Sequence, residues 1–421
     1  MYGNKIFIIF YAIVICFLFI ITCKNENPNV KRNIAESYKY SELLSYELSF
    51  GSEQYGTPNK YLLISSGWRS MDINSKGEFI IGDEYSIKVF DAHGKAIKIF
   101  GNKGQGPGAY EEESPELFIS PNNYLTVINS SFYPVYTIYS PEYKFVNTER
   151  IVLPDTAITY IKEKTLVTDG NKILSAVNKV WAYNEKECVY IFRLNISDKY
   201  FVFCLYKYDN VYKPLFIFKN PNVLTYSWGG VDAMFSDDIG TYDIYIMNNG
   251  KIMYYTSEDD LYVSDTEGYY ILHIVSVYTG EEKIIKQKYA PVLYPEPETL
   301  EEFYKKAYGK RYENKIKNMI KEEIEYCVKR KYVPSLEWIS FDGNYIFAFQ
   351  KRQYGNNIIF STKENYDVDI FDMLEQKYIK TVKLSQLYLT IRYGYIYISG
   401  KDSKGYGIIN KYKINPSVYG K

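Results

Sequence analysis

The sequence predicts an all-β protein, a six-bladed β-propeller with a helical insertion between blades four and five. Three observations support this prediction. Residues 68–112 read as four short strands joined by turns, which is the length of one propeller blade. A short alternating motif from that blade recurs along the chain, whereas residues 298–333 show helical periodicity.

The first blade is the clearest. Its strands are expected at Trp68–Ile73, Glu78–Ile81, Ser86–Phe90 and Lys95–Phe100. Runs rich in Ile, Val and Phe favour strands, and the Gly, Asn and Asp residues between them favour tight turns. Its third strand contains most of Ile87–Asp91, a stretch that alternates apolar and polar residues.

Similar alternating stretches recur at Val135–Ser140, Leu205–Asp209, Val275–Thr279, Val368–Asp372 and Ile409–Ile414. With the first blade they predict six blades over residues 41–416, and seven is the alternative count. Strands are expected ahead of most of these stretches, at Leu117–Ser120, Ile158–Thr168, Lys172–Tyr183, Tyr242–Met247, Leu336–Phe341 and Leu387–Arg392. An N-terminal strand, Tyr46–Phe50 or Tyr61–Ile64, is expected to complete the last blade, so that no sheet edge stays open across the ring.

Residues 298–333 are expected to form a helix or a helix pair. Apolar residues from Leu300 to Val328 recur at three- and four-residue spacing, and Glu and Lys fill the other face. Pro297 and Pro334 mark the two ends. We expect this insertion to pack on the edge of the propeller, and a docking helix or lid is the functional alternative.

Three pieces of the first blade carry a family resemblance, namely Gly77–Asp83, Ile87–Lys95 and Gly104–Tyr110. They are similar to an NHL-type repeat. More closely, they resemble the six-bladed β-propeller lipoproteins of Gram-negative bacteria, whose blade ends in a GQGPGEY-like loop. Ala109 stands where that loop usually has Glu. The resemblance implies the fold far more than a function, because the family mostly lacks an assigned activity.

Residues 1–22 read as a lipoprotein signal peptide. The apolar run Ile6–Thr22 follows Lys5 and ends in Ile-Ile-Thr-Cys, so cleavage before Cys23 would leave that cysteine to carry the lipid. An uncleaved membrane anchor is the alternative, for which the run is short. Lys24, in place of Asp, favours the outer membrane, and the body is expected to lie outside the cytoplasm. The polar residues 23–40 are expected to form a flexible tether.

Three cysteines lie in the body of the protein. Cys188 and Cys204 flank an expected turn at Asn195–Asp198, so the two could form a disulfide in an oxidising compartment. Buried thiols are the favoured alternative, and the spacing with Cys327 fits no metal site. The chain has 50 basic and 50 acidic residues, a balance that argues against a nucleic-acid partner.

The sequence predicts no catalytic residue, no metal ligand and no cofactor. Glycine-rich residues 101–108 lack the Gly-Lys-Ser/Thr of a phosphate loop and precede a strand, so a turn between blades is expected. Residues 72–77 resemble the start of a calcium loop, but Lys76 occupies a ligand position. The chain has two histidines, His93 and His273, too few for a three-histidine metal site, and each is expected to be an ordinary turn or strand residue.

The loops that lead into the inner strands are expected to form a binding face, because such loops converge around a propeller channel. The candidate ligand-binding residues there are aromatic or charged: Trp68, Arg69, Tyr110, Glu116, Tyr226, Trp228, Glu337 and Trp338. Exposed aromatic rings beside an arginine and carboxylates would suit a sugar ring or a peptide. The alternative is that the tryptophans fill the core between blades.

Two functions fit these features. The favoured one is a lipid-anchored extracytoplasmic propeller that binds a glycan, a peptide or a partner protein without catalysis. The alternative is an enzyme of the propeller lactonase or lyase type, which would use carboxylates, with or without calcium. The spacing of the acidic residues singles out no catalytic pair.

Overall fold

The structure is a computed structural model of the 421-residue chain. It describes residues 43–64, 70–104, 106, 108–128, 135–166, 173–197, 199–221, 223–228, 231–235, 240–247, 250–308, 317–351, 365–385 and 390–421. The expected signal peptide, tether and lipidation site at Cys23 lie outside these residues. No helix in the described ranges combines the length and the apolar character needed to cross a membrane.

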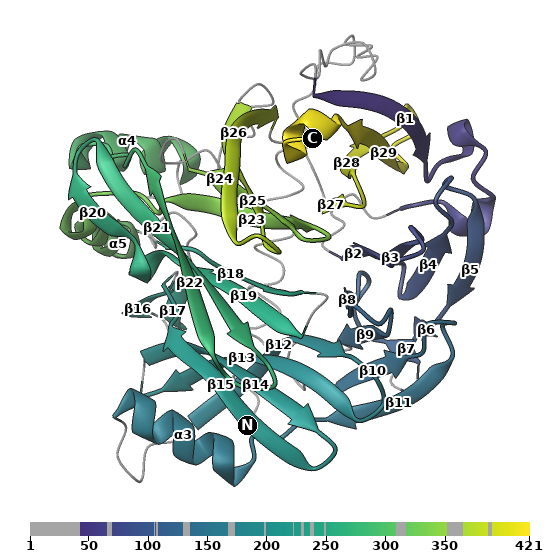
Figure 1. The fold of residues 1–421 in the computed structure, drawn as a ribbon, viewed down its shortest axis with the longest axis horizontal. Coiled ribbons are helices and arrows are strands. Elements are labelled where there is room, and N and C mark those ends of the chain that lie inside the picture. Colours follow the sequence, from purple (N-terminus) through teal and green to yellow (C-terminus); the bar gives the residue numbers. More distant parts are fainter. Residues whose placement is uncertain are drawn as a thin grey trace. The chain divides into compact units, whose positions relative to one another are not determined.

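Six antiparallel sheets form a ring in the described part of the chain, which confirms the predicted six-bladed propeller (Figure 1). Blade one contains β2 (Met71–Ile73), β3 (Phe79–Asp83), β4 (Ser86–Phe90) and β5 (Ala96–Phe100). Blade two contains β8 (Glu116–Ile119), β9 (Leu125–Ile128), β10 (Val135–Tyr139) and β11 (Phe145–Arg150). Blade three contains β12 (Ile173–Ala182), β13 (Glu187–Ile196), β14 (Lys199–Tyr208) and β15 (Val211–Lys219).

The second half of the ring follows the same order, with the first strand of each blade toward the centre. Blade four contains β18 (Tyr242–Ile246), β19 (Lys251–Thr256), β21 (Glu267–Ser276) and β22 (Glu282–Tyr289), with β20 (Leu261–Ser264) added along β21. Blade five contains β23 (Leu336–Asp342), β24 (Tyr345–Gln350), β25 (Asn365–Asp372) and β26 (Lys377–Ser385). Two short pairs lie between blades, β6 (Asn102–Lys103) with β7 (Ala109–Tyr110) and β16 (Val223–Trp228) with β17 (Val231–Phe235).

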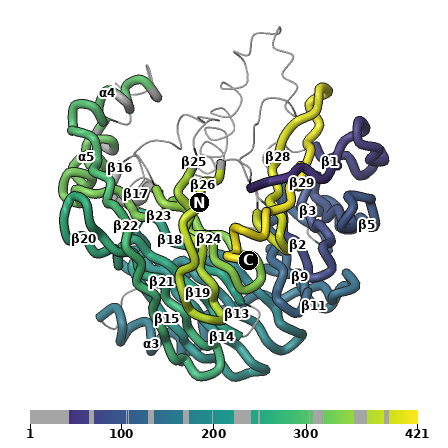
Figure 2. Tube along the Cα trace, turned by 45° about the horizontal axis from the view of Figure 1, so that its top comes forward, coloured from purple at the N-terminus to yellow at the C-terminus, as the bar shows by residue number. Residues whose placement is uncertain are grey.

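Blade six joins the two ends of the described chain. It contains β27 (Thr390–Arg392), β28 (Tyr395–Lys401), β29 (Gly407–Ile414) and the N-terminal strand β1 (Leu44–Phe50). Strand β1 is antiparallel to β29, with Leu44 opposite Ile414 and Phe50 opposite Ile409 (Figure 2). Of the two N-terminal candidates, Tyr46–Phe50 therefore completes the blade, while Leu63 of the other forms a single bridge to Gly407.

The core lies in layers between neighbouring blades. Phe79 packs against Tyr397 of blade six, with ring centroids 5.2 Å apart. The next residue, Ile80, points to the opposite face of β3 and shares a cluster with Val127 of blade two. Because successive strand residues alternate between faces, a strand in the middle of a blade can bury side chains against both neighbouring blades. Burial of these apolar layers stabilises the ring.

One predicted strand is wrong. A strand is expected at Ile158–Thr168, ahead of the repeated stretch of blade three, but α3 (Asp155–Thr165) is a helix. Ala157 and Ile161, one helical turn apart, are both buried, and α3 packs on β15. Asp155 in the first turn and the lysines of the last turn complement the helix dipole. The inner strand of blade three is β12, as Lys172–Tyr183 predicted.

The helical insertion consists of α4 (Pro297–Tyr308) and α5 (Lys317–Arg330), which lie between β22 and β23 in the sequence. Both views place these helices beside β20 at the outside of blade four (Figures 1 and 2). Leu300 of α4 and Cys327 of α5 share a buried cluster with Tyr294 and Val333. The helices thus pack against the segments that enter and leave them.

Cys188 and Cys204 are buried free thiols, so the disulfide considered from the sequence does not form. Cys188 lies opposite Lys207, while Cys204 lies opposite Ile191. An offset of three residues puts the two sulfurs on opposite faces of blade three. Cys188 accordingly belongs to the layer shared with blade two, and Cys204 belongs to the layer shared with blade four.

Candidate functional site

A cavity of about 160 Å³, here called the channel cavity, lies where the inner strands end. All six blades contribute to its wall. The lining residues are Asp72, Ile73, Ser75, Ile119, Ser120, Pro121, Trp181, Tyr245, Ile246, Phe341, Gly343, Arg392 and Tyr393. Contributions from every blade place this cavity on the axis of the ring, where ligand sites in propellers can draw on many loops.

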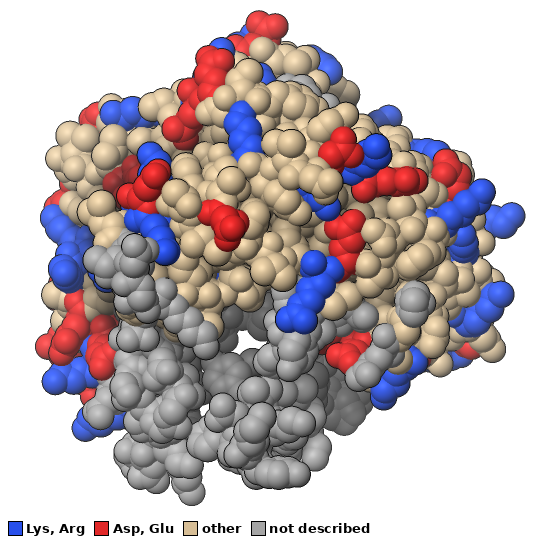
Figure 3. All heavy atoms as spheres, turned by 90° about the horizontal axis from the view of Figure 1, so that it is seen from below, with Lys and Arg blue, Asp and Glu red and all other residues tan. Residues whose placement is uncertain are grey.

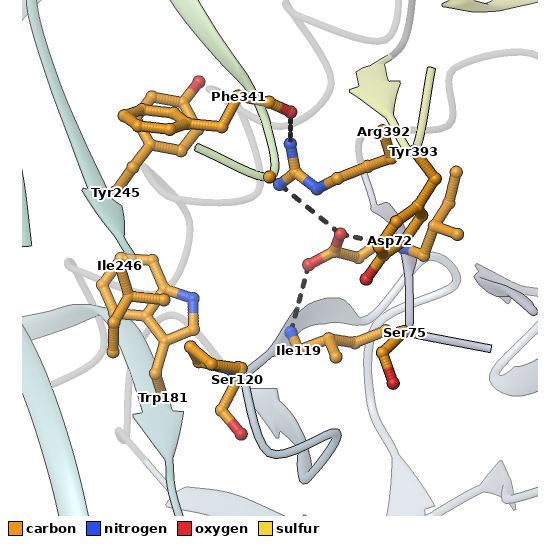
Figure 4. A pocket seen from close by; sticks show the side chains of 13 residues that line it. Asp72, Ser75, Ile119, Ser120, Trp181, Tyr245, Ile246, Phe341, Arg392 and Tyr393 are labelled. Atoms are coloured by element: carbon orange, nitrogen blue, oxygen red, sulfur yellow. Dashed lines mark hydrogen bonds and ion pairs between the residues drawn. The ribbon is translucent and has the colours of Figure 1, made fainter. Parts of the chain in front are cut away.

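A carboxylate and a guanidinium form the polar part of the channel cavity (Figure 4). One oxygen of Asp72 accepts the N–H of Ile73 at 2.8 Å, and the other accepts the N–H of Ile119 at 3.1 Å. Nη2 of Arg392 lies 3.7 Å from Oδ1 of Asp72, which is an ion pair but too long for a hydrogen bond. Burial raises the pKa of Asp72, and Arg392 together with the two backbone N–H groups opposes that rise.

Arg392 is held by backbone carbonyls of two blades. Its Nη1 donates to the carbonyl of Phe341 at 2.6 Å and to that of Ile391 at 2.9 Å. A guanidinium has five N–H donors, so the donors on Nε and Nη2 remain. These have no hydrogen-bond partner among the described residues. Arg392 therefore presents an oriented, partly unsatisfied cation to the channel cavity.

Aromatic rings form another part of the wall. The rings of Tyr245 and Phe341 lie 4.9 Å apart, and Trp181 lines the cavity from blade three. Nζ of Lys179 lies 5.3 Å from the ring of Tyr245 and 5.9 Å from that of Trp181, and it donates to the carbonyl of Ile244 at 3.2 Å. Burial lowers the pKa of Lys179, which nearby Asp243 counteracts. The cavity thus combines flat apolar faces with a few fixed polar groups, the usual composition of a small-ligand site.

The channel side of the inner strands is capped by side chains from neighbouring blades. Asp72 accepts the N–H of Ile119 in the next blade, and Asp243 accepts the N–H of Ile339 in the same way at 2.8 Å. The hydroxyl of Tyr245 donates to the carbonyl of Ile339. The innermost strand of a blade has no strand partner on this side, so its backbone groups need such bonds. These bonds fix the wall of the channel cavity.

Half of the predicted binding residues cannot be placed by their side chains. Trp68 and Arg69 lie outside the described residues. Tyr226 and Trp228 belong to β16, for which the structure describes the backbone path but not the side chains.

The other four predicted residues lie away from the channel cavity lining. Tyr110 is fully buried, and its hydroxyl lies 2.7 Å from that of Tyr139. Glu116 is exposed at the start of β8. Glu337 lies 3.4 Å from Nζ of Lys351 in a nearly buried ion pair. Trp338 stacks on Phe349 within blade five, with ring centroids 4.9 Å apart.

The predicted binding residues do not include Asp72, Trp181, Tyr245 or Arg392, and the only motif considered at Asp72 was a calcium loop. Each of these residues is the last or nearly the last residue of an inner strand, or the centre of a very short one. The predicted residues instead lie mostly before or at the beginning of such strands. The residues that line the channel cavity therefore lie toward the opposite end of these strands.

The histidines lie outside the channel cavity lining. His93 is exposed in the turn after β4, as expected. The ring of His273 in β21 lies between two carboxylates, 3.0 Å from Asp259 and 2.9 Å from Glu282, and their hydrogen bonds raise its pKa against the effect of burial. In the ranges that the structure describes, no group of three or more His, Cys, Asp or Glu side chains is placed to hold a metal ion.

Charges on the visible face are mixed. Figure 3 shows Lys and Arg side chains interspersed with Asp and Glu over the tan surface. This distribution matches the balanced composition of the chain.

No model of a known protein family matches the chain, and no curated protein matches it. Several solved structures are similar. The β-propeller domain of the Trilobed protease from Pyrococcus furiosus is 8% identical, with 79% of each chain covered and a TM-score of 0.33. The AfRom2 CNH domain is 9% identical over 83% of this chain and 97% of that one, with a TM-score of 0.32. The WD40 domain of SCAP from fission yeast is 9% identical over 84% and 95%, with a TM-score of 0.24. At these values the comparisons carry no functional argument, and the fold rests on the sheets described above.

Proposed function

We propose that this chain is a non-catalytic binding module whose channel cavity takes one unit of a glycan. The observation that carries the proposal is the composition of the cavity wall, in which Trp181 and Tyr245 stand near the Arg392–Asp72 pair. Sugar rings stack on aromatic faces and hydrogen bond to charged planar groups, so this combination suits them.

The size of the channel cavity supports a single ring. Its volume is about 160 Å³, and a cavity of roughly 150 Å³ holds one benzene molecule. Ser120 also lines the cavity, and its buried hydroxyl has no hydrogen-bond partner among the described residues. A hydroxyl-rich ligand could supply that partner.

We further propose that the module is lipidated at Cys23 and held at the outer membrane. The support is the apolar run that ends in Ile-Ile-Thr-Cys, the Lys at position 24, and the resemblance of the first blade to the six-bladed propeller lipoproteins. A tethered binding module needs no cofactor, whereas the lactonase or lyase alternative would add calcium.

Saturation-transfer NMR, which detects binding, tests the proposal with a panel of monosaccharides and acetylated tripeptides. Trp181→Ala should weaken binding of the responding sugar by about 1–3 kcal/mol, the usual loss for an aromatic stacking contact. Because Trp181 is buried in the layer between blades three and four, this change should also lower thermal stability. Trp338→Ala is the matched control, because Trp338 packs within blade five. It should lower thermal stability and leave affinity unchanged.

Three outcomes would contradict the proposal. Loss of binding in Trp338→Ala but not in Trp181→Ala would move the site to the face of the predicted loops. A response from the tripeptides alone would exclude a glycan. Conversion of the bound sugar to a product would favour the enzymatic alternative.

A further inference from the structure

We propose that the unit bound in the channel cavity is an acidic sugar, whose carboxylate is held by the guanidinium of Arg392. This inference rests on the proposed function and names the ligand class within it. It depends on three features of the cavity: the donors of Arg392 that have no hydrogen-bond partner among the described residues, the backbone hydrogen bonds that Asp72 accepts, and the shape of the aromatic wall.

The guanidinium of Arg392 is oriented to bind an anion. Its Nη1 is anchored to the carbonyls of Phe341 and Ile391, which fixes the plane of the guanidinium. The donors on Nε and Nη2 lie on one edge of that plane and have no hydrogen-bond partner in the described ranges. Two parallel N–H donors on one edge match the two oxygens of a carboxylate.

Asp72 does not occupy those donors. Its two oxygens accept backbone N–H groups at 2.8 and 3.1 Å, while Nη2 of Arg392 stays 3.7 Å away. A ligand carboxylate can therefore bind Arg392 without breaking a hydrogen bond between the two side chains. Asp72 and Arg392 are the charged residues of the lining, so the pair leaves the cavity close to neutral.

A cationic ligand fits less well. To reach the oxygens of Asp72 it would have to lie beside the guanidinium of Arg392, a like charge 3.7 Å from Oδ1. Lys179 lies 5.3 Å from the ring of Tyr245, and nearby Asp243 opposes its charge. The preference for an anion therefore comes from the donors of Arg392.

A sugar acid fits better than the carboxylate of a peptide. The flat faces of Trp181, Tyr245 and Phe341 and the single-ring volume suit a pyranose. A peptide terminus would bring an extended backbone, which neither the flat aromatic faces nor the small volume accommodates. Binding of a peptide carboxylate would therefore contradict the sugar assignment.

Titration of the chain from residue 24 to residue 421 with methyl α-D-galacturonide and with methyl α-D-galactoside tests the inference. The two probes differ in the carboxylate alone. We expect the uronide to bind at least about tenfold more tightly, because its carboxylate adds hydrogen bonds to a charged group. Higher ionic strength should reduce this preference and leave the neutral sugar unaffected.

Arg392→Lys keeps the charge and removes the two parallel N–H donors of the guanidinium, so it should abolish most of the tenfold preference. Arg150→Lys in the exposed outer strand β11 is the matched control and should bind like the parent. Thermal unfolding of both variants checks that Arg392→Lys still folds. If this variant does not fold, the effect of ionic strength on the preference of the parent protein for the uronide is the remaining test.

Equal affinity for the two glycosides would overturn the inference while leaving the proposed function intact. Binding of acetyl-Gly-Gly in place of both glycosides would overturn the sugar assignment and the proposed function together. Preference for the uronide that persists in Arg392→Lys would overturn the role of Arg392.

Discussion

Lys88 offers the sharpest test of the physical reasoning about the fold, because it is a buried charge in blade one. Its side chain is 1% exposed, and its Nζ lies 2.7 Å from Oδ2 of Asp83, 2.8 Å from Oε2 of Glu84 and 2.6 Å from the carbonyl of Leu62. Asp83 is fully buried and also accepts the N–H of Ile64 at 3.0 Å. The pair thus connects β4 to the segment that follows β1.

Replacing Lys88 by Met keeps the volume and removes the charge. At 2.7 Å and an effective dielectric constant of about 20, the attraction to Asp83 is roughly 6 kcal/mol. Most of this is offset by the several kcal/mol needed to remove each ion from water. Removing one partner leaves the Asp83 carboxylate buried and uncompensated, so we expect the free energy of unfolding to fall by about 3–5 kcal/mol.

Urea unfolding monitored by tryptophan fluorescence measures this change. The matched control is Lys331→Met, which removes an ion pair with Asp265 of nearly the same length, 2.8 Å, between side chains 56% and 61% exposed. An exposed pair contributes about 0–1 kcal/mol, so the control should be close to the parent. A loss below about 1 kcal/mol in Lys88→Met would refute the reasoning about the buried pair.

Two further predictions concern the tether and the pH dependence of stability. Cys23→Ser should abolish incorporation of labelled palmitate and release the protein from the membrane fraction; an unlabelled parent protein would contradict lipidation. Burial raises the pKa of Asp260 from 3.8 to about 7, so between these values the native state keeps a proton that the unfolded state loses. Stability should therefore fall as pH rises through this window, by up to about 1.4 kcal/mol per pH unit, and Asp260→Asn should remove that contribution. Equal slopes of unfolding free energy against pH for parent and variant would exclude this role.

The blades were predictable because their signals are local. In blade one, the turns at Asn74–Gly77 and Asp91–Gly94 separate strands whose alternation needs no knowledge of the rest of the chain. The failure at α3 is also local. Ile158 and Thr159 favour a strand, but the burial of Ala157 and Ile161 against β15 outweighs that propensity.

The channel cavity was not predictable in the same way. Asp72, Trp181 and Arg392 come from three blades and are far apart in the sequence. Only ring closure brings them together, and nothing near any one of them indicates which end of its strand faces the cavity. Pairings such as Asp243 with the N–H of Ile339 depend on the same long-range geometry.

The pairing of β1 with β29 has a consequence for the order of folding. During synthesis β1 leaves the ribosome before the strands of the first blade, while β29 is made after those of the fifth. The first five blades can form from contiguous segments as they appear, but the sixth cannot form until β29 has been made. Such distant pairing slows folding and leaves a strand edge open in the meantime. A truncation that removes residues 407–421 would therefore leave β1 without its partner and the ring unable to close.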